Sequence, residues 1–266
     1  MPSGGVSGVK LHFLGTGTSF GIPVIGCECE VCTSDDPRNQ RTRHGALLEE
    51  DGRRLLIDTP PELRLQLLRA GVSDVDAVWY THCHADHTHG VDDLRIFSVR
   101  RRRPLPVYVS ADCGRILARR FDYVFDPDLR PTEGTTRPEA RLEFYHSLEP
   151  IDIAGFSMLP LPVPHGNMEV YGFRVGDLGY ITDAKLLPER TRAALAGVRV
   201  LVLNALWFGN PHPTHFNVEE AVEAARGIGA ELTYLTHLTH RLDHHTLEQH
   251  LPPGIRPAYD GLVVEI

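Results

Sequence analysis

Short apolar runs alternate with helical patterns along the chain. Runs rich in Val, Ile, Leu and aromatic residues, bordered by turn residues, predict strands. These strands are 9–15, 44–50, 53–58, 77–81, 105–110, 156–163, 170–176, 178–182, 198–204, 231–236 and 261–266. The helical patterns are 61–71, 90–100, 187–197 and 217–229. In the last of them Asn217 is a candidate N-cap, with Glu220 as its partner. Residues 126–141, which contain Pro, Gly, Thr and Arg, predict a surface loop.

Length and composition narrow the class of protein. The 266 residues are 42% hydrophobic and 23% charged, which excludes a disordered chain. Apolar runs such as 201–208 are far shorter than the ~20 residues of a membrane helix. The first ten residues lack the pattern of a signal peptide. We therefore expect a cytoplasmic protein with no membrane partner, and a net charge of −8 argues against nucleic acid as its partner.

Polar residues follow several predicted strands within a few positions. Strands of a buried sheet have no other reason to end repeatedly in His or Asp, and α/β scaffolds build their sites from such residues at the carboxyl ends of strands. The residues are Asp58, His82, His165, Asp183, Asn204 and His237. This pattern predicts a functional site assembled from distant parts of the chain.

A dense group of ligand-type residues follows the apolar run 75–80. His82, His84, Asp86 and His87 form an H-x-H-x-D-H string. Imidazole and carboxylate ligands at this spacing can serve two adjacent metals, which two-metal sites hold ~3.5–4 Å apart. The alternative is a solvated polar loop, which four ligand-type residues in six, directly after a hydrophobic strand, argue against.

Three of the five cysteines lie within six residues. Cys27, Cys29 and Cys32 form a C-x-C-x-x-C string, and a closed structural zinc site needs a fourth ligand. Cys83 lies inside the His-rich string and Cys113 in an unrelated segment, so His240 is the better candidate for the fourth position. This predicts a Cys3His zinc site. A redox pair at Cys29 and Cys32, or three unrelated buried thiols, are the alternatives.

The order of these motifs resembles the metallo-β-lactamase superfamily over nearly the whole chain. Its five motifs match Asp58, the string from His82 to His87, His165, Asp183 and His237. The resemblance implies one metal held by His82, His84 and His165. It implies a second metal held by Asp86, His87 and His237, with Asp183 bridging the two. It also implies an αββα sandwich of two mixed sheets with outer helices. We expect one such domain over residues 1–266, with residues 1–8 as a flexible tail.

The cysteine loop narrows the resemblance. Together with the THLTH segment at 236–240 and the C-terminal segment 258–266, it is similar to the cyclic-phosphate phosphodiesterase branch, which acts on phosphoribosyl 1,2-cyclic phosphate. Members of this branch carry an extra Cys3His zinc beside a dinuclear, often manganese-bound, site. The resemblance implies a small-molecule phosphodiester substrate, two catalytic divalent metals (Mn²⁺ or Zn²⁺, with Fe as a further option) and one structural Zn²⁺. A pyrroloquinoline-quinone biosynthesis protein has a similar cysteine loop but usually lacks the intact H-x-H-x-D-H string.

Hydrolysis of a phosphodiester also needs a proton for the leaving alkoxide, and His is the usual donor near pH 7. His215 is the candidate general acid, with His212 as its competitor, and Asp86 is the third residue expected to take part in catalysis. Arg41 and Arg43 are candidates for phosphate binding, with a solvated surface run as the alternative reading.

Three other functions compete with phosphodiester hydrolysis. The metal motif is compatible with a carbonyl or thioester hydrolase of the same superfamily. A tRNA 3′-processing endonuclease is disfavoured, because no long basic insertion is present and the net charge is negative. A carrier or binding module would not need the complete set of ligands. A homodimer is the default assembly for such a chain.

Overall fold

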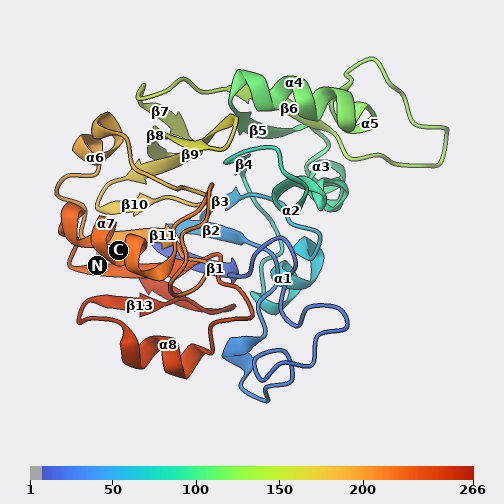
Figure 1. Ribbon diagram of the computed structural model, residues 1–266. Helices are drawn as coiled ribbons and strands as arrows, with labels where there is room; N and C mark the ends of the chain where they lie inside the picture. Colours follow the sequence, from blue (N-terminus) through green and yellow to red (C-terminus); the bar gives the residue numbers. More distant parts are fainter. Residues whose placement is uncertain (1–7) are drawn as a thin grey trace, which may run out of the picture.

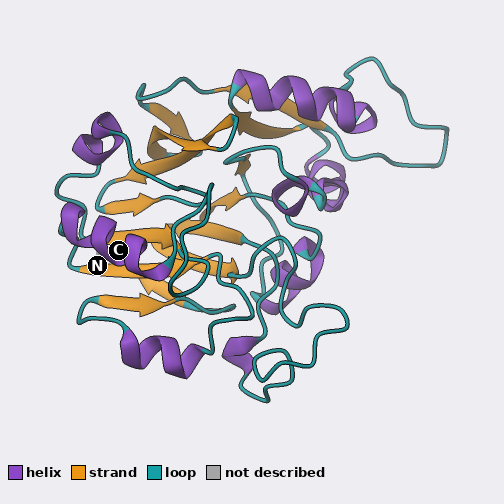
Figure 2. Cartoon of the chain, viewed as in Figure 1, coloured by secondary structure: helices purple, strands orange, loops and turns teal. Residues whose placement is uncertain are grey.

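Two β-sheets face each other, and helices cover their outer sides in the computed structural model, which describes residues 8–266 (Figures 1 and 2). Within these residues the first sheet has seven strands in the order β14-β1-β2-β3-β4-β5-β6. Their bounds are β1 Lys10–Gly15, β2 Gly45–Glu50, β3 Arg53–Ile57, β4 Ala77–Trp79, β5 Leu105–Val109, β6 Ala140–Phe144 and β14 Val263–Glu265. The sheet is mixed, because β3, β4, β5 and β6 run parallel while β14, β1, β2 and β3 pair antiparallel.

The second sheet also has seven strands within the described part of the chain, in the order β13-β12-β11-β10-β9-β8-β7. Their bounds are β7 Ile151–Ile153, β8 Phe156–His165, β9 Met168–Val175, β10 Leu178–Tyr180, β11 Val200–Asn204, β12 Leu232–Thr236 and β13 Ile255–Pro257. Strands β10 to β13 are parallel, and β7 to β10 pair antiparallel.

The helices between the strands are short. Their bounds are α1 Leu63–Arg69, α2 Ala85–Thr88, α3 Arg95–Arg101, α4 Ala111–Arg120, α5 Asp122–Phe125, α6 Glu189–Ala194, α7 Val218–Ile228 and α8 His244–His250, with 3₁₀ turns η1 Pro37–Asn39 and η2 Val91–Leu94. The predicted start of α7 is confirmed, because Asn217 and Glu220 form a reciprocal capping box.

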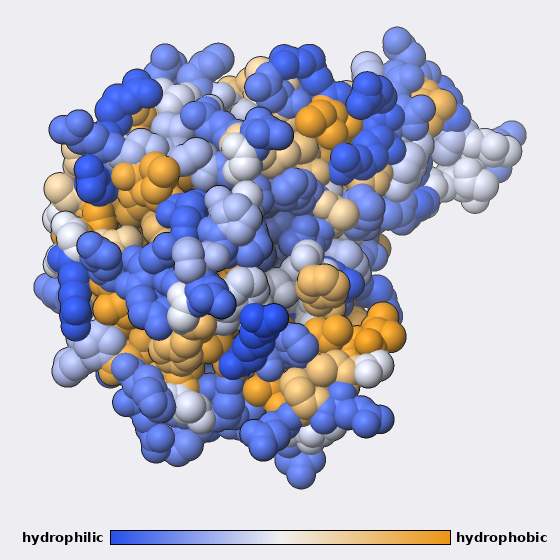
Figure 3. Space-filling model, in the orientation of Figure 1, coloured by the Kyte–Doolittle hydropathy of each residue, from blue (hydrophilic) through white to orange (hydrophobic). Residues whose placement is uncertain are grey.

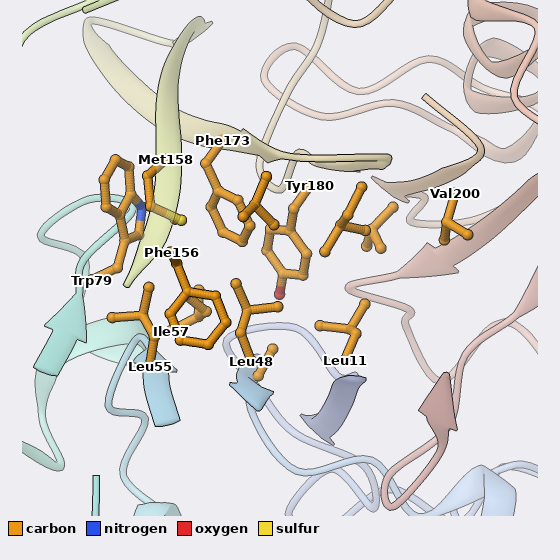
Figure 4. Packing of buried hydrophobic residues seen from close by; sticks show 14 of the residues in the cluster. Leu11, Leu48, Leu55, Ile57, Trp79, Phe156, Met158, Phe173, Tyr180 and Val200 are labelled. Carbon is orange, nitrogen blue, oxygen red and sulfur yellow. The ribbon is translucent and has the colours of Figure 1, made fainter. Parts of the chain in front are cut away.

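The main core lies between the two sheets and explains why the strands read as continuous apolar runs. On β3, Leu55 and Ile57 lie in the cluster between the sheets, which also contains Trp79, Phe156 and Tyr180 (Figure 4). Leu56, between them in sequence, packs on the outer side with residues of α1, α3 and α4. A third cluster joins the second sheet to α7 and α8. Both faces of each sheet are therefore buried, and the predicted αββα sandwich is confirmed.

Several element predictions were wrong in detail. The predicted helix 90–100 is a 3₁₀ turn followed by α3, and the predicted loop 126–141 ends in β6. The apolar and polar pattern did not predict α4, α5, α8, β6, β7 or β13. Strands of three residues such as β7 are too short for an alternating pattern, and α4 contains Gly114, which lowers helix propensity.

The first described residues lie beside the C-terminal residue, since the N–H of Ile266 donates to the C=O of Val9 at 2.8 Å. Residues 1–7 of the predicted tail lie outside the described residues. The extent of a single domain over 1–266 therefore stays a prediction. No helix in residues 8–266 is long and apolar enough to cross a membrane. The face shown in Figure 3 is largely hydrophilic, with smaller apolar areas between the polar side chains.

Candidate metal centre and active site

The His-rich string forms the loop from β4 into the short helix α2. His82 is 2% exposed, and its Nε2 lies 3.0 Å from Nδ1 of His84. His165, the last residue of β8, brings its ring centroid to 5.6 Å from that of His82 and 5.2 Å from that of His84. Ligand atoms of these three residues all lie within 4.8 Å of one another. The structure therefore brings together the three residues predicted for one metal.

The residues predicted for the second metal also converge. Ligand atoms of Asp86, His87 and His237 lie within 4.8 Å of one another. Asp183, which follows β10, lies between the two groups. Its Oδ2 is 3.5 Å from Nε2 of His87, its Oδ1 is 3.3 Å from Nε2 of His237, and it also groups with His82. This position is the one that a bridging carboxylate requires.

Asp58 holds the His-rich loop from behind. Its buried carboxylate accepts hydrogen bonds from the N–H and the hydroxyl of Thr81, both at 2.8 Å, and from Nδ1 of His87 at 2.7 Å. The last bond fixes the His87 tautomer that leaves Nε2 free on the side of Asp86 and Asp183. Asp58 thus orients a candidate ligand, as the resemblance implies.

Three of these residues have left-handed backbone conformations. The φ angle is +61° at Asp58, +56° at Asp183 and +56° at His237. Non-glycine residues rarely adopt this conformation, and such strain persists where surrounding structure fixes it, which is commonly at functional sites. Each residue directly follows or nearly follows a strand, so the sharp change of direction turns its side chain out of the sheet pattern.

The polar atoms of the centre fit divalent metals. The Nε2 of His87 and both ring nitrogens of His237 are buried without a hydrogen-bond partner among the described residues. Burial alone would lower the pKa of His87, but Asp86, Asp183 and Asp58 together raise it to about 10. Three carboxylates therefore create a demand for positive charge at this point, which metal cations would meet as well as a proton.

The histidines of the first group are suited to the same purpose for a different reason. Burial lowers the pKa of His82, His84 and His165. Neutral imidazoles keep a nitrogen lone pair, which a metal needs and which protonation would remove. The fit therefore extends to both halves of the centre.

The cysteine loop converges on His240. Its Nδ1 lies 3.3 Å from Sγ of Cys27 and 3.6 Å from Sγ of both Cys29 and Cys32. All five cysteines of the chain are free thiols. The backbone N–H of Cys32 lowers the pKa of the Cys29 thiol to about 6, whereas burial raises that of Cys32 to about 11. The arrangement matches the predicted Cys3His set, with one thiol already favouring the thiolate.

The two arginines considered for phosphate are engaged elsewhere. Arg41 is fully buried, and its guanidinium donates to the C=O of Thr239 at 3.0 Å and to Oδ1 of Asn39 at 3.1 Å. Arg43 forms an ion pair with Glu62. Arg41 is therefore neither a phosphate ligand nor a solvated surface residue. It ties η1, which follows the cysteine loop in the chain, to the segment between His237 and His240.

The two candidate general acids lie side by side between β11 and α7. His215 donates from Nε2 to Oδ1 of Asp183 at 2.8 Å, and its side chain is 12% exposed. His212 lies one step further out, with its Nδ1 3.3 Å from Nδ1 of His215, and Thr214 contacts both rings. Only His215 contacts the centre directly, which favours it over His212.

Sequence reasoning left two residues near the centre without a role. Asn204, noted only as a polar strand end, accepts from the N–H of Ala184 at 2.7 Å and donates to its C=O at 3.1 Å, so it holds the backbone directly after Asp183. His44, just before β2, is fully buried beside His87 and His237 and was missed. A histidine opening a buried apolar strand was the signal that could have found it.

Comparison with known proteins identifies the family. Residues 53–238, more than half of the chain, match the beta-lactamase superfamily domain. The chain belongs to the beta-lactamase superfamily. The predicted membership is therefore confirmed, and the matched range contains Asp58, the His-rich string, His165, Asp183 and His237.

Individual members of the superfamily differ in their described activities. A solved diphosphatase from the PhnP family is 38% identical, with a TM-score of 0.89, over 97% of this chain and 98% of that one. An octanoyltransferase from Porphyromonas gingivalis is 37% identical over 96% of this chain, which spans only 51% of that relative. A ribonuclease Z from Methanopyrus kandleri is 25% identical over 86% of this chain and 94% of its own length.

Proposed function

We propose that the chain is a metal-dependent phosphodiesterase that hydrolyses a small cyclic phosphodiester of the phosphoribosyl type. One observation carries the proposal: Asp183 lies within ligand distance of both predicted sets and also accepts a hydrogen bond from His215. It groups with His82 and with His165 of the first set, and it lies 3.5 Å from His87 and 3.3 Å from His237 of the second. Paired cations next to a proton donor are what cleavage of a P–O bond needs. Similarity to a PhnP-family diphosphatase over 97% of the chain supports phosphate as the reacting group.

His82, His84 and His165 would hold one divalent ion, and Asp86, His87 and His237 the other, with Asp183 shared. When bound, Mn²⁺ or Zn²⁺ ions would supply positive charge for the phosphate oxygens and lower the pKa of water toward about 7. The Cys3His group would hold a structural zinc.

His215 supplies the proton in this proposal. Its Nε2–H is already fixed by Asp183, so the proton sits at a defined position beside the shared carboxylate. In the imidazolium form of His215, transfer of this proton to the leaving alkoxide leaves a neutral imidazole and an alcohol, and so avoids release of a strongly basic group. His212 and Thr214 hold the opposite side of the ring and thereby fix its orientation.

A cavity beside His82 is suited to the organic part of a small substrate. Its volume is about 790 Å³, and its walls come from α4, from residues 145–147 and from the turn after His165. This volume lies in the usual range for small-molecule pockets.

The loop 126–139, which projects from the body in Figure 1, carries four carboxylates and two arginines. Its negative balance disfavours an RNA substrate.

The test compares leaving groups. When a cyclic ribose phosphodiester is hydrolysed, the leaving group is a ribose alkoxide, which must be protonated. When bis(p-nitrophenyl) phosphate is hydrolysed, the leaving group is p-nitrophenolate, which needs no proton. We expect His215→Asn to lower turnover of the cyclic substrate by ~10²–10⁴-fold and turnover of bis(p-nitrophenyl) phosphate much less. His245→Asn, on the exposed side of α8, is the matched control. Equal losses on both substrates would contradict the role of His215.

A thioester hydrolase is the second candidate function, favoured by the octanoyltransferase relative at 37% identity. Octanoyl thioester and a precursor tRNA belong in the same assay. Turnover of the thioester or the tRNA in preference to the phosphodiesters would overturn the proposal.

A further inference from the structure

His44 lies beneath the candidate metal centre, at the junction of the two sheets. It precedes β2 of the first sheet, and both ring nitrogens are bonded to the second sheet. The hydroxyl of Tyr180 on β10 lies 2.6 Å from Nε2, and the hydroxyl of Thr236 on β12 lies 3.3 Å from Nδ1. These two bonds fix the plane of the ring and leave no nitrogen for a metal. His44 therefore lines the metal centre without being one of its ligands.

The ring of His44 packs against two candidate ligands of the second metal. The ring centroid of His44 is 5.5 Å from that of His87 and 5.9 Å from that of His237. Interplanar angles of 43° and 57° show that the rings are tilted against one another. Removing the His44 ring would therefore remove packing contacts from both His87 and His237.

His237 depends on such packing more than the other buried histidines of the metal centre do. The outer Nδ1 of His82 is bonded to Thr81, that of His87 to Asp58 and that of His165 to Thr214, at 2.7–3.2 Å. Nδ1 of His237 has no partner in the described part of the chain. Metal-ligating histidines are normally oriented by an outer hydrogen bond, so the ring of His237 must be oriented by the rings packed against it. These are His215 at 5.0 Å, His44 at 5.9 Å and His87 at 6.0 Å between centroids. Of the three, His44 is the one held by groups outside the centre, the hydroxyls of Tyr180 and Thr236.

We propose that His44 is a positioning residue that orients His237 by ring packing and thereby sets the affinity for the second metal. The inference rests on the proposed metal centre. It assigns a purpose to a fully buried histidine that binds no ligand and takes no part in proton transfer. It also explains why both ring nitrogens of His44 are hydrogen-bonded, because a ring that could rotate would not hold its neighbour in one orientation.

The experiment measures Mn²⁺ binding by calorimetric titration after a chelator has removed the ions of the centre. His44→Ala removes the ring that packs against His237. The double variant His44→Phe with Tyr180→Phe keeps a ring of similar size and removes the polar pair without leaving a buried hydroxyl of Tyr180 unpartnered. His12→Ala, on the neighbouring strand β1, is the control for loss of a partly buried histidine. Thermal melting of each metal-depleted variant checks the fold.

We expect His44→Ala to weaken the second Mn²⁺ step about 10–100-fold, the usual cost of losing a ligand's supporting group, with the first step unchanged. The Phe–Phe variant and His12→Ala should bind both ions like the wild type. Equal binding by His44→Ala, or an equal loss in the Phe–Phe variant, would overturn the role of ring packing. Failure of the wild type to bind two ions would instead overturn the proposed function.

Discussion

Asp58→Asn is the substitution that most cleanly separates orientation of the centre from folding. Asparagine has nearly the same shape and tolerates the left-handed conformation that Asp58 adopts, with φ +61°. The backbone is therefore unchanged, and the difference is the charge and one acceptor. The amide NH₂ would take the place of Oδ2, which now accepts from the hydroxyl of Thr81 and from Nδ1 of His87.

The consequences for the two donors differ. The hydroxyl of Thr81 can reverse and accept from the new amide, whereas Nδ1–H of His87 would face another N–H. His87 would then favour the tautomer with its proton on Nε2, the atom that faces Asp86 and Asp183. Loss of such a supporting group typically costs 10–100-fold in metal affinity, which corresponds to about 1.4–2.8 kcal/mol.

The assay is a competition titration of Mn²⁺ or Zn²⁺ against a chelator of known affinity. Asp76→Asn is the matched control. Like Asp58, Asp76 accepts a hydrogen bond from a backbone N–H, that of Arg54 at 2.9 Å, and it also pairs with Arg101. It directly precedes β4, however, whereas the His-rich loop follows that strand, so Asp76 lies at the end of β4 away from the metal centre. Asp76→Asn should leave metal affinity unchanged. Metal affinity of Asp58→Asn within threefold of the wild type would refute the reasoning.

Three further predictions concern the supporting structure. Cys27→Ser should lower both the melting temperature and the metal content of the centre, and unchanged values of both would contradict the coupling of the two sites. Asn204→Leu leaves the N–H and C=O of Ala184 without partners and should cost about 1–3 kcal/mol in urea unfolding. Burial would raise the pKa of Asp243, but the N–H of Thr246 helps to lower it to about 2. Because the unfolded pKa is about 3.9, the stability that the charge of Asp243 contributes is complete above that pH and is lost as the pH falls toward 2. An asparagine at this position would keep the cap without the charge, so the stability gap between wild type and Asp243→Asn should close over this range.

The parts of the site that could be predicted are those with a local sequence signal. The His-rich string and the cysteine string are dense in ligand-type residues, and the order of Asp58, His165 and Asp183 after strands repeats a known superfamily pattern. Parallel strands with buried faces bring such strand ends to one edge of a sandwich. The layer architecture follows from the same apolar runs.

The rest depended on contacts between distant residues. His44 is one histidine in an ordinary strand sequence, and only the second sheet, through Tyr180 and Thr236, shows what it does. Arg41 stands in a polar run, yet it is fully buried, and its guanidinium donates to the C=O of Thr239, 198 residues further along the chain, and to Asn39. Short elements such as β7 are set by pairing with a neighbour rather than by a pattern of their own.

The central claim is tested most directly by metal content. Wild type, Asp183→Ala and Cys29→Ser would be purified without added metal, and their metals measured by plasma emission alongside hydrolysis of a cyclic phosphodiester. The account predicts a zinc that survives Asp183→Ala and is lost in Cys29→Ser, together with two further divalent ions that Asp183→Ala removes along with turnover. A single, cysteine-dependent metal in the wild type, with no hydrolysis, would contradict it.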